Sequence, residues 1–165
     1  LFCESTLRYL KGEVDPDLHQ QLLATFLEIY NADPCVDTKP FHGILDFLEW
    51  GMQHNKKLIC VTNKPEQPAR KILEILNMDH YFVDVIGGDR FEKRKPDPIQ
   101  LNYCIEHYQS TADKTLMIGD SSNDVEAARR AQVDCVVLSY GYNHGEDIQL
   151  CQPQQVIDDV MELLH

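Results

Sequence analysis

The chain has 165 residues and a formal net charge of −12 at pH 7. Hydrophobic residues make up 43% of it and charged residues 25%, values typical of globular proteins, so the composition excludes an intrinsically disordered chain. Asp and Glu number 27 against 15 Lys and Arg, which argues against a broad surface for nucleic acid or anionic membranes.

The first third of the chain is predicted to be helical. Apolar residues recur at helical spacing from Leu18 to Tyr30, and Asp17 is a candidate N-cap. A second helix is expected after Pro40, with Gly51 near its end. No strand pattern precedes Lys57.

From Lys57 onward, short apolar runs alternate with helical patterns. Buried strands are predicted over residues 58–61, 82–86, 116–118 and 135–138. Helices are predicted with Pro68 in a first turn, from about Pro98, after Asn123, and finally over residues 156–164. This alternation implies a parallel sheet covered by helices on both faces, so the predicted fold class is α/β with a three-layer, Rossmann-like sheet.

Cysteine usage indicates a reduced, cytoplasmic protein. None of the six cysteines forms a CxxC pair, and Cys60 and Cys135 lie in apolar runs as buried hydrophobes would. The sequence shows no signal peptide, glycosylation acceptor or membrane-spanning run. The seven histidines show no metal-binding spacing, and no nucleotide-binding glycine motif occurs.

Polar residues follow three of the predicted strands, at the sheet edge where ligands bind in such folds. Thr62 follows the first strand, Lys95 comes after the loop that follows the second, and Asp120 ends the third. The Thr62 hydroxyl and neighbouring backbone N–H groups suit the oxygens of a phosphoryl group. A cation at Lys95 would neutralise phosphate charge.

Asp120 and Asp124 are candidate ligands of Mg²⁺. They lie one helical turn apart, and their carboxylates suit an oxygen-liganded ion that keeps several waters. The alternative is helix capping by Ser121 or Ser122, with Asp124 favourable in the first turn. Capping does not account for Asp120.

The order and spacing of these groups resemble the haloacid dehalogenase superfamily. The segments 61–66, 95–96 and 119–124 resemble its second, third and fourth motifs. Segments 61–66, 86–89 and 140–145 are also similar to signatures of the phosphoglycolate phosphatases in that superfamily. The similarity runs from about Pro40 to the end of the chain. Residues 1–38 then look like the C-terminal part of a helical cap domain, and residues 39–165 like an α/β core.

The resemblance implies a Mg²⁺-dependent phosphomonoester hydrolase that works through an aspartyl-phosphate intermediate. Its substrate would be a small phosphorylated metabolite, with 2-phosphoglycolate the first choice. Thr62 and the backbone at Asn63 would hold the phosphoryl oxygens, and Lys95 would neutralise charge. Asp120 would bind Mg²⁺ directly, and Asp124 would bind the ion or its waters. No nucleic-acid or membrane partner is implied, and the oligomeric state is left open.

One motif of the family is missing from the sequence. The first motif, Asp-x-Asp-x-Thr after an apolar strand, would supply the nucleophile and the general acid/base. Residues 15–17 offer a near match, but they precede a helix and follow a polar stretch, which argues against that role. The chain, which starts at Leu1 in a helical pattern, is therefore expected to be truncated and to lack the nucleophile and the central strand.

Three alternatives to an active phosphatase for 2-phosphoglycolate stay open at this point. An inactive chain could bind phosphate or a protein partner without turnover. A related phosphatase or a phosphomutase could use the same residues on another substrate. A phospho-acceptor receiver domain also uses Asp, Thr and Lys, but there the acidic residues precede the other two, so the order Thr62, Lys95, Asp120 argues against it.

Overall fold

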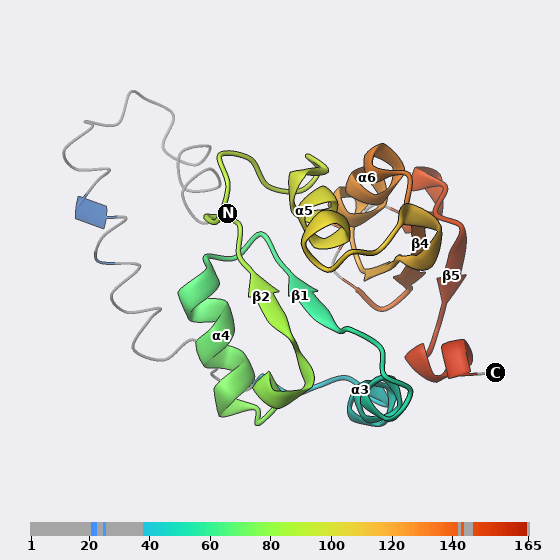
Figure 1. Cartoon of the computed structure of the whole chain (residues 1–165), viewed down its shortest axis with the longest axis horizontal. Coiled ribbons are helices and arrows are strands. Elements are labelled where there is room, and N and C mark those ends of the chain that lie inside the picture. Colours follow the sequence, from blue (N-terminus) through green and yellow to red (C-terminus); the bar gives the residue numbers. More distant parts are fainter. Residues whose placement is uncertain (1–20, 23–24, 26–37, 142, 144–146, 165) are drawn as a thin grey trace. The chain divides into compact units, whose positions relative to one another are not determined.

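The computed structural model describes residues 21, 22, 25, 38–141, 143 and 147–164 (Figure 1). The chain divides into two compact units, Leu1–Thr38 and Lys39–His165. The helix predicted over residues 18–30 lies largely outside the described residues, although Gln21, Leu22 and Thr25 are helical.

The second unit alternates helices with short strands, as the sequence predicts. Its helices are α3 (Ile44–Gln53), α4 (Glu66–Ile75), α5 (Ile99–His107) and α6 (Ser122–Ala131). Its strands are β1 (Ile59–Val61), β2 (Asp84–Ile86), β3 (Leu116–Gly119), β4 (Asp134–Leu138) and β5 (Gln155–Ile157). Four 3₁₀ turns complete it: η1 (Asp79–Tyr81), η2 (Ala112–Lys114), η3 (Ile148–Cys151) and η4 (Val160–Leu164).

All strand pairs in the described residues are parallel, but they form two sheets. One sheet has the order β1-β2 and the other β3-β4-β5. In the first, Val61 lies opposite Ile86, and in the second, Gly119 lies opposite Val137. The predicted α/β class with parallel strands is confirmed. Among the described strands no ladder joins β1 to β3, and the absence of a central strand stays a prediction.

The final helix predicted over residues 156–164 is wrong. Val156 and Ile157 instead belong to β5, where they lie opposite Val137 and Leu138 of β4. The chain then turns into η4, because the Glu162 carboxylate accepts hydrogen bonds from the backbone N–H groups of residues 158 and 159 at 3.0 Å. Apolar residues here fit both periodicities, and the ladder to a buried strand decides between them.

Two apolar clusters cover the two faces of the β3-β4-β5 sheet. On one face, Cys135 and Val137 pack with the small residues of α6, of which Ala127 and Ala128 expose no surface. On the other face, Val136 and Leu138 pack with Ile157 and Val160, and residues of α3 lie against them. Alternate residues of β4 therefore face opposite layers, as a buried strand requires. No helix of the described segments is long and apolar enough to cross a membrane.

Candidate functional site

Three loops carry the predicted site residues, and each follows the carboxyl end of a strand. The β1 loop begins at Thr62, whose backbone N–H donates to Ile86 O at 3.0 Å and so joins the ends of β1 and β2. The β2 loop runs from Gly87 to Lys95. The β3 loop begins at Asp120.

The Lys95 side chain connects the ends of the two sheets. Its Nζ donates to the backbone oxygen of Val61 at 2.7 Å and lies 2.7 Å from Asp124 Oδ1. The two side chains of this ion pair are 8% and 5% exposed. The structure therefore brings Lys95 between the β1 loop and the first turn of α6.

Both oxygens of Asp124 are occupied. While Oδ1 faces Lys95, Oδ2 accepts hydrogen bonds from Asp120 N at 3.0 Å, Ser121 N at 3.1 Å and Ser121 Oγ at 2.8 Å. Ser121 and Asp124 form a capping box at the start of α6, so helix capping is part of the role of Asp124. Burial alone would raise the pKa of Asp124, but the Lys95 charge and these hydrogen bonds outweigh it and lower the pKa.

Close backbone approaches hold the acidic segment in place. A Cβ atom on Gly119 would lie 2.4 Å from Asp124 Cβ, and one on Gly141 would lie 2.1 Å from Asp120 Cβ. The backbone N–H of Ser122 also donates to Asn143 Oδ1 at 2.9 Å. Asp120 itself remains exposed at the end of β3.

The β1 loop is folded on itself and against the β2 loop. Thr62 Oγ1 accepts a hydrogen bond from Lys64 N at 3.1 Å, and Gly88 N donates to Lys64 O at 2.7 Å. Asn63 Nδ2 donates to Lys95 O at 2.8 Å. Asn63 Oδ1 is buried and has no hydrogen-bond donor among the described residues. It is an acceptor that a group outside those residues would satisfy.

A buried amide that sequence reasoning missed lies behind these loops. Gln100 is the second residue of α5 and exposes 0% of its surface. Its Nε2 donates to Gly87 O at 2.9 Å and to Thr62 O at 3.3 Å, and its Oε1 accepts from Lys95 N at 3.2 Å. Nothing in the local pattern distinguishes this Gln, because its neighbours Leu101 and Cys104 make an ordinary apolar stripe.

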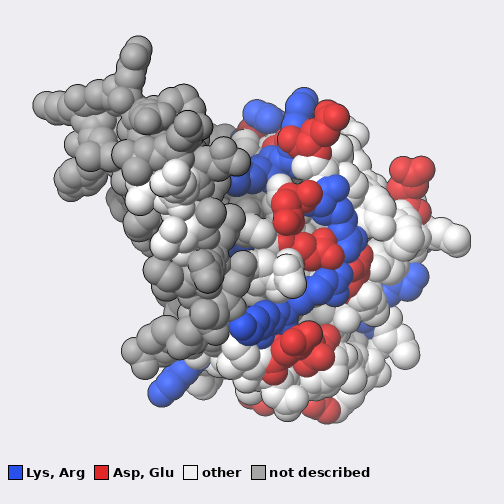
Figure 2. Space-filling view, turned by 90° about the vertical axis from the view of Figure 1, so that its left-hand side faces the viewer, with Lys and Arg blue, Asp and Glu red and all other residues white. Residues whose placement is uncertain are grey.

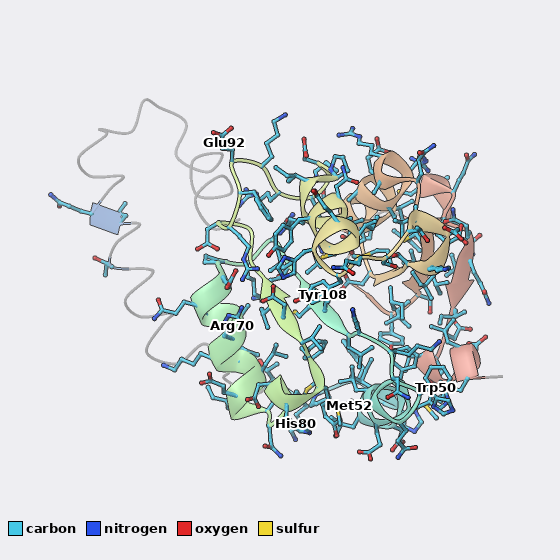
Figure 3. All side chains as sticks on the ribbon, in the orientation of Figure 1. Trp50, Met52, Arg70, His80, Glu92 and Tyr108 are labelled. Atoms are coloured by element: carbon cyan, nitrogen blue, oxygen red, sulfur yellow. The ribbon has the colours of Figure 1, made fainter. Side chains whose placement is uncertain are left out.

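An ion-pair network that sequence reasoning also missed fixes α4 against β2. Arg90 reaches Glu66 and Asp84 at 2.7 Å each, and Arg70, labelled in Figure 3, reaches the same two carboxylates at 2.9 and 2.8 Å. The Arg90 hydrogen bond is the main cause of a lowered pKa at Glu66. Asp89 accepts from Glu66 N at 2.8 Å and so holds the β2 loop to the start of α4.

Charges on the visible face of the molecule are mixed. In Figure 2, Lys and Arg side chains lie interspersed with Asp and Glu side chains over the described part of this face. The described part of this face therefore carries both signs of charge side by side.

The donor set suits Mg²⁺ at one position. Asp120 offers an exposed carboxylate, the hard oxygen donor that this ion prefers. Both oxygens of Asp124 are already engaged, by Lys95 and by the groups at the start of α6. No cluster of three or more His, Cys, Asp or Glu residues with metal-binding geometry occurs among the described residues.

Comparison with known families identifies the family to which this arrangement belongs. The sequence profile of a family described as haloacid dehalogenase-like hydrolases matches residues 2–138. The chain belongs to this family.

The relatives of the chain within the family include phosphatases. Proteins named phosphoglycolate phosphatase from Nitrosococcus oceani and Photobacterium profundum are 39% and 40% identical to it. These alignments cover 93% and 94% of this chain and 68% of each relative. A phosphoglycolate phosphatase from Pseudomonas putida is 38% identical over 93% of this chain, which spans 56% of that relative.

Solved structures share the fold. A predicted phosphoglycolate phosphatase from Haemophilus somnus aligns with a TM-score of 0.91 at 27% identity, over 98% of this chain and 72% of that one. A second, from Lactobacillus delbrueckii, aligns with a TM-score of 0.79 at 27% identity, over 91% of this chain and 62% of that one. The family predicted from the three motifs is thus confirmed, together with its fold.

Proposed function

We propose that this chain carries the phosphate-binding and charge-neutralising part of a phosphatase that hydrolyses a small phosphomonoester, with 2-phosphoglycolate as the substrate. The observation that carries the proposal is the buried Lys95 ammonium, which lies between Val61 O and Asp124 Oδ1 at 2.7 Å from each. The names of the relatives support the choice of substrate.

Lys95 has one donor left for a phosphoryl oxygen. A lysine ammonium carries three N–H donors, and the two contacts at 2.7 Å use two of them. A phosphoryl oxygen that accepted the third would meet a charge held in a poorly solvated position, where its electrostatic effect is stronger than in water. Asp124 holds the ammonium in place and partly balances its charge.

We assign the Thr62 hydroxyl as a second donor to the same phosphoryl group. Its Oγ1 already accepts a hydrogen bond from Lys64 N, so the hydrogen on that oxygen points elsewhere. We assign the backbone N–H of Asn63 as a further donor to the phosphoryl oxygens. Thr62 and Lys95 then contribute from two loops whose backbones are joined through Asn63 Nδ2.

Mg²⁺ is the proposed cofactor, with Asp120 as its direct ligand and Asp124 as the holder of one of its waters. When bound, the ion supplies positive charge that offsets the charge of the phosphoryl group. Asp120 brings its carboxylate to the end of β3 because Gly141 leaves space beside it.

We further propose that the aspartate nucleophile, the general acid/base and the first strand of the core are absent from this chain. Residues 1–38 would then be part of a cap domain and residues 39–165 the remaining core. The missing Asp-x-Asp-x-Thr motif favours a second candidate function for the 165-residue chain itself, namely phosphate binding without turnover.

Two measurements on the purified chain test these proposals. Inorganic phosphate binding, followed by NMR of the backbone amides, should shift the signals of Thr62, Asn63 and Lys95. Thr62→Val should weaken this binding by roughly tenfold, the effect of one hydrogen bond to a charged group. Thr111→Val, at an exposed position just before η2, is the matched control and should bind as the unmodified chain does.

Phosphate release from 2-phosphoglycolate, with and without Mg²⁺, is the second measurement. We expect none from the 165-residue chain. Mg²⁺-dependent turnover that Asp120→Asn abolishes would support the phosphatase proposal and contradict the missing nucleophile. Failure of phosphate to bind at all would contradict the phosphate site.

A further inference from the structure

Gln100 is the most completely buried polar side chain near the loops of the site. It exposes 0% of its surface, although its carboxamide carries two donors and an acceptor. A buried amide of this kind is costly unless all its groups are bonded. Here its four polar contacts within 3.5 Å all go to backbone atoms.

Those backbone atoms belong to the loops that carry the proposed phosphate ligands. Nε2 donates to Gly87 O at 2.9 Å, with longer contacts to Thr62 O at 3.3 Å and Ile86 O at 3.5 Å. Oε1 accepts from Lys95 N at 3.2 Å. One carboxamide thus bonds the first residue of the β1 loop, the first residue of the β2 loop and the backbone of the lysine.

We infer that Gln100 is a positioning residue that sets the distance between Thr62 and Lys95, and thereby lets both engage one phosphoryl group. This inference rests on the proposed phosphate site. Neither hydrogen-bonding function of Gln100 is replaceable by an apolar side chain, because Gly87 O and Lys95 N would both lose a buried partner. The carboxamide projects from the first turn of α5, so it adds a link from a helix to the contacts that the two loops make with each other.

The expected effect of losing this contact is on ligand affinity. A displacement of about 1 Å in a positioning element can cost up to about a hundredfold in an active site. Gln100→Met keeps the length and shape of the side chain but removes the donors and the acceptor. We expect this variant to bind inorganic phosphate at least about tenfold more weakly than the unmodified chain, with a displaced backbone amide signal for Lys95. Gln53→Met, at the exposed end of α3, is the matched control and should change neither.

Gln100→Glu separates hydrogen bonding from packing. An ionised Glu would turn a carboxylate toward three backbone carbonyl oxygens, so burial and repulsion should raise its pKa. When protonated, the same carboxyl has one donor and one acceptor and restores the bonds to Gly87 O and Lys95 N. The phosphate affinity of Gln100→Glu relative to the unmodified chain should therefore rise as the pH falls from about 8 to about 5.5. The lowered pKa of Asp124 keeps that carboxylate ionised over this range, and the ratio cancels the titration of phosphate itself.

The outcomes divide cleanly. The positioning role is supported if the phosphate affinity of Gln100→Glu, relative to that of the unmodified chain, rises as the pH falls, while the same ratio for Gln100→Met does not change with pH. Equal phosphate affinity of Gln100→Met and the unmodified chain overturns it while leaving the proposed phosphate site intact. Far-UV circular dichroism shows whether Gln100→Met folds. If it does not, a folded Gln100→Glu whose relative phosphate affinity does not change with pH overturns the inference. Absence of phosphate binding by the unmodified chain overturns the proposed function and this inference with it.

Discussion

Replacing Asp124 by Asn should leave the Lys95 ammonium buried without its counter-charge. The side chains of this pair are 8% and 5% exposed, with Nζ and Oδ1 separated by 2.7 Å. Removing one partner of a buried ion pair typically costs about 3–5 kcal/mol, because the remaining charge stays desolvated. An Asn oxygen still accepts the N–H groups at the start of α6, so the capping contribution is largely kept. A domain of this size is stable by about 5–15 kcal/mol, and the substitution should remove a large share of that free energy of unfolding.

Urea unfolding at neutral pH measures the loss. Trp50 is the single tryptophan of the chain and lies on α3, so its fluorescence reports on the packed core. Glu126→Gln is the matched control, because Glu126 lies on the same helix and pairs with Arg129 and Arg130, whose side chains are about half exposed. Surface pairs of that kind contribute about 0–1 kcal/mol. If Asp124→Asn costs no more than Glu126→Gln, the reasoning from burial is refuted.

The pH dependence gives an independent check on the same pair. Because the pKa of Asp124 is lowered in the folded state, its contribution is complete above the unfolded pKa of about 3.9 and is lost as the pH falls through the folded value. The stability difference between the unmodified chain and Asp124→Asn should therefore be constant from about pH 5 to pH 8 and shrink below about pH 4. A difference that changes with pH near neutrality would show that another group dominates.

Two further predictions concern close packing and thiol burial. Thermal unfolding should show that Gly87→Ala destabilises the domain by about 1–3 kcal/mol, because the new Cβ would lie 2.3 Å from Glu66 N. Gly51→Ala in α3 is the control. Its Cβ would meet only the flexible Leu58 side chain, at 3.0 Å or more, so its stability should be close to that of the unmodified chain. Equal losses in the two variants would contradict the backbone clash. Burial raises the pKa of the Cys135 thiol to about 12, whereas Cys151 is half-buried. Alkylation of the folded protein near pH 8, followed by peptide mass spectrometry, should therefore label Cys151 well before Cys135. In urea both cysteines should be labelled. Comparable labelling of the two in the folded state would rule out this burial.

The sequence predicts the fold wherever one periodicity dominates. Strands β1 to β4 are apolar runs that end at turn-forming or polar residues, and each is found where it was predicted, although β2 begins at Asp84 and not at Phe82. The C-terminal segment fails because residues 156–164 satisfy a helical pattern and a strand pattern equally well. Pairing with β4 decides there, and such pairing depends on residues far away in the chain.

Some residues of the candidate site can be predicted from the sequence and others cannot. Thr62, Lys95 and Asp120 are predicted from their places after strands, because topology alone brings strand ends to one edge. Gln100 and Arg90 could not be predicted, since their importance depends on backbone groups of other loops that the sequence does not show to be near. Only one of the two roles of Asp124 can be predicted. Its capping role is local in the sequence, whereas its contact with Lys95 joins residues 29 positions apart.

The crowded glycines restrict how this site is able to change through mutation. At Gly87, Gly88, Gly119 and Gly141, any side chain would begin less than 3 Å from a neighbouring atom of the loops. A replacement at any of these four positions therefore requires neighbouring atoms to shift, at a cost in stability. A change of ligand preference that keeps these loops in place would therefore come from residues other than these four glycines.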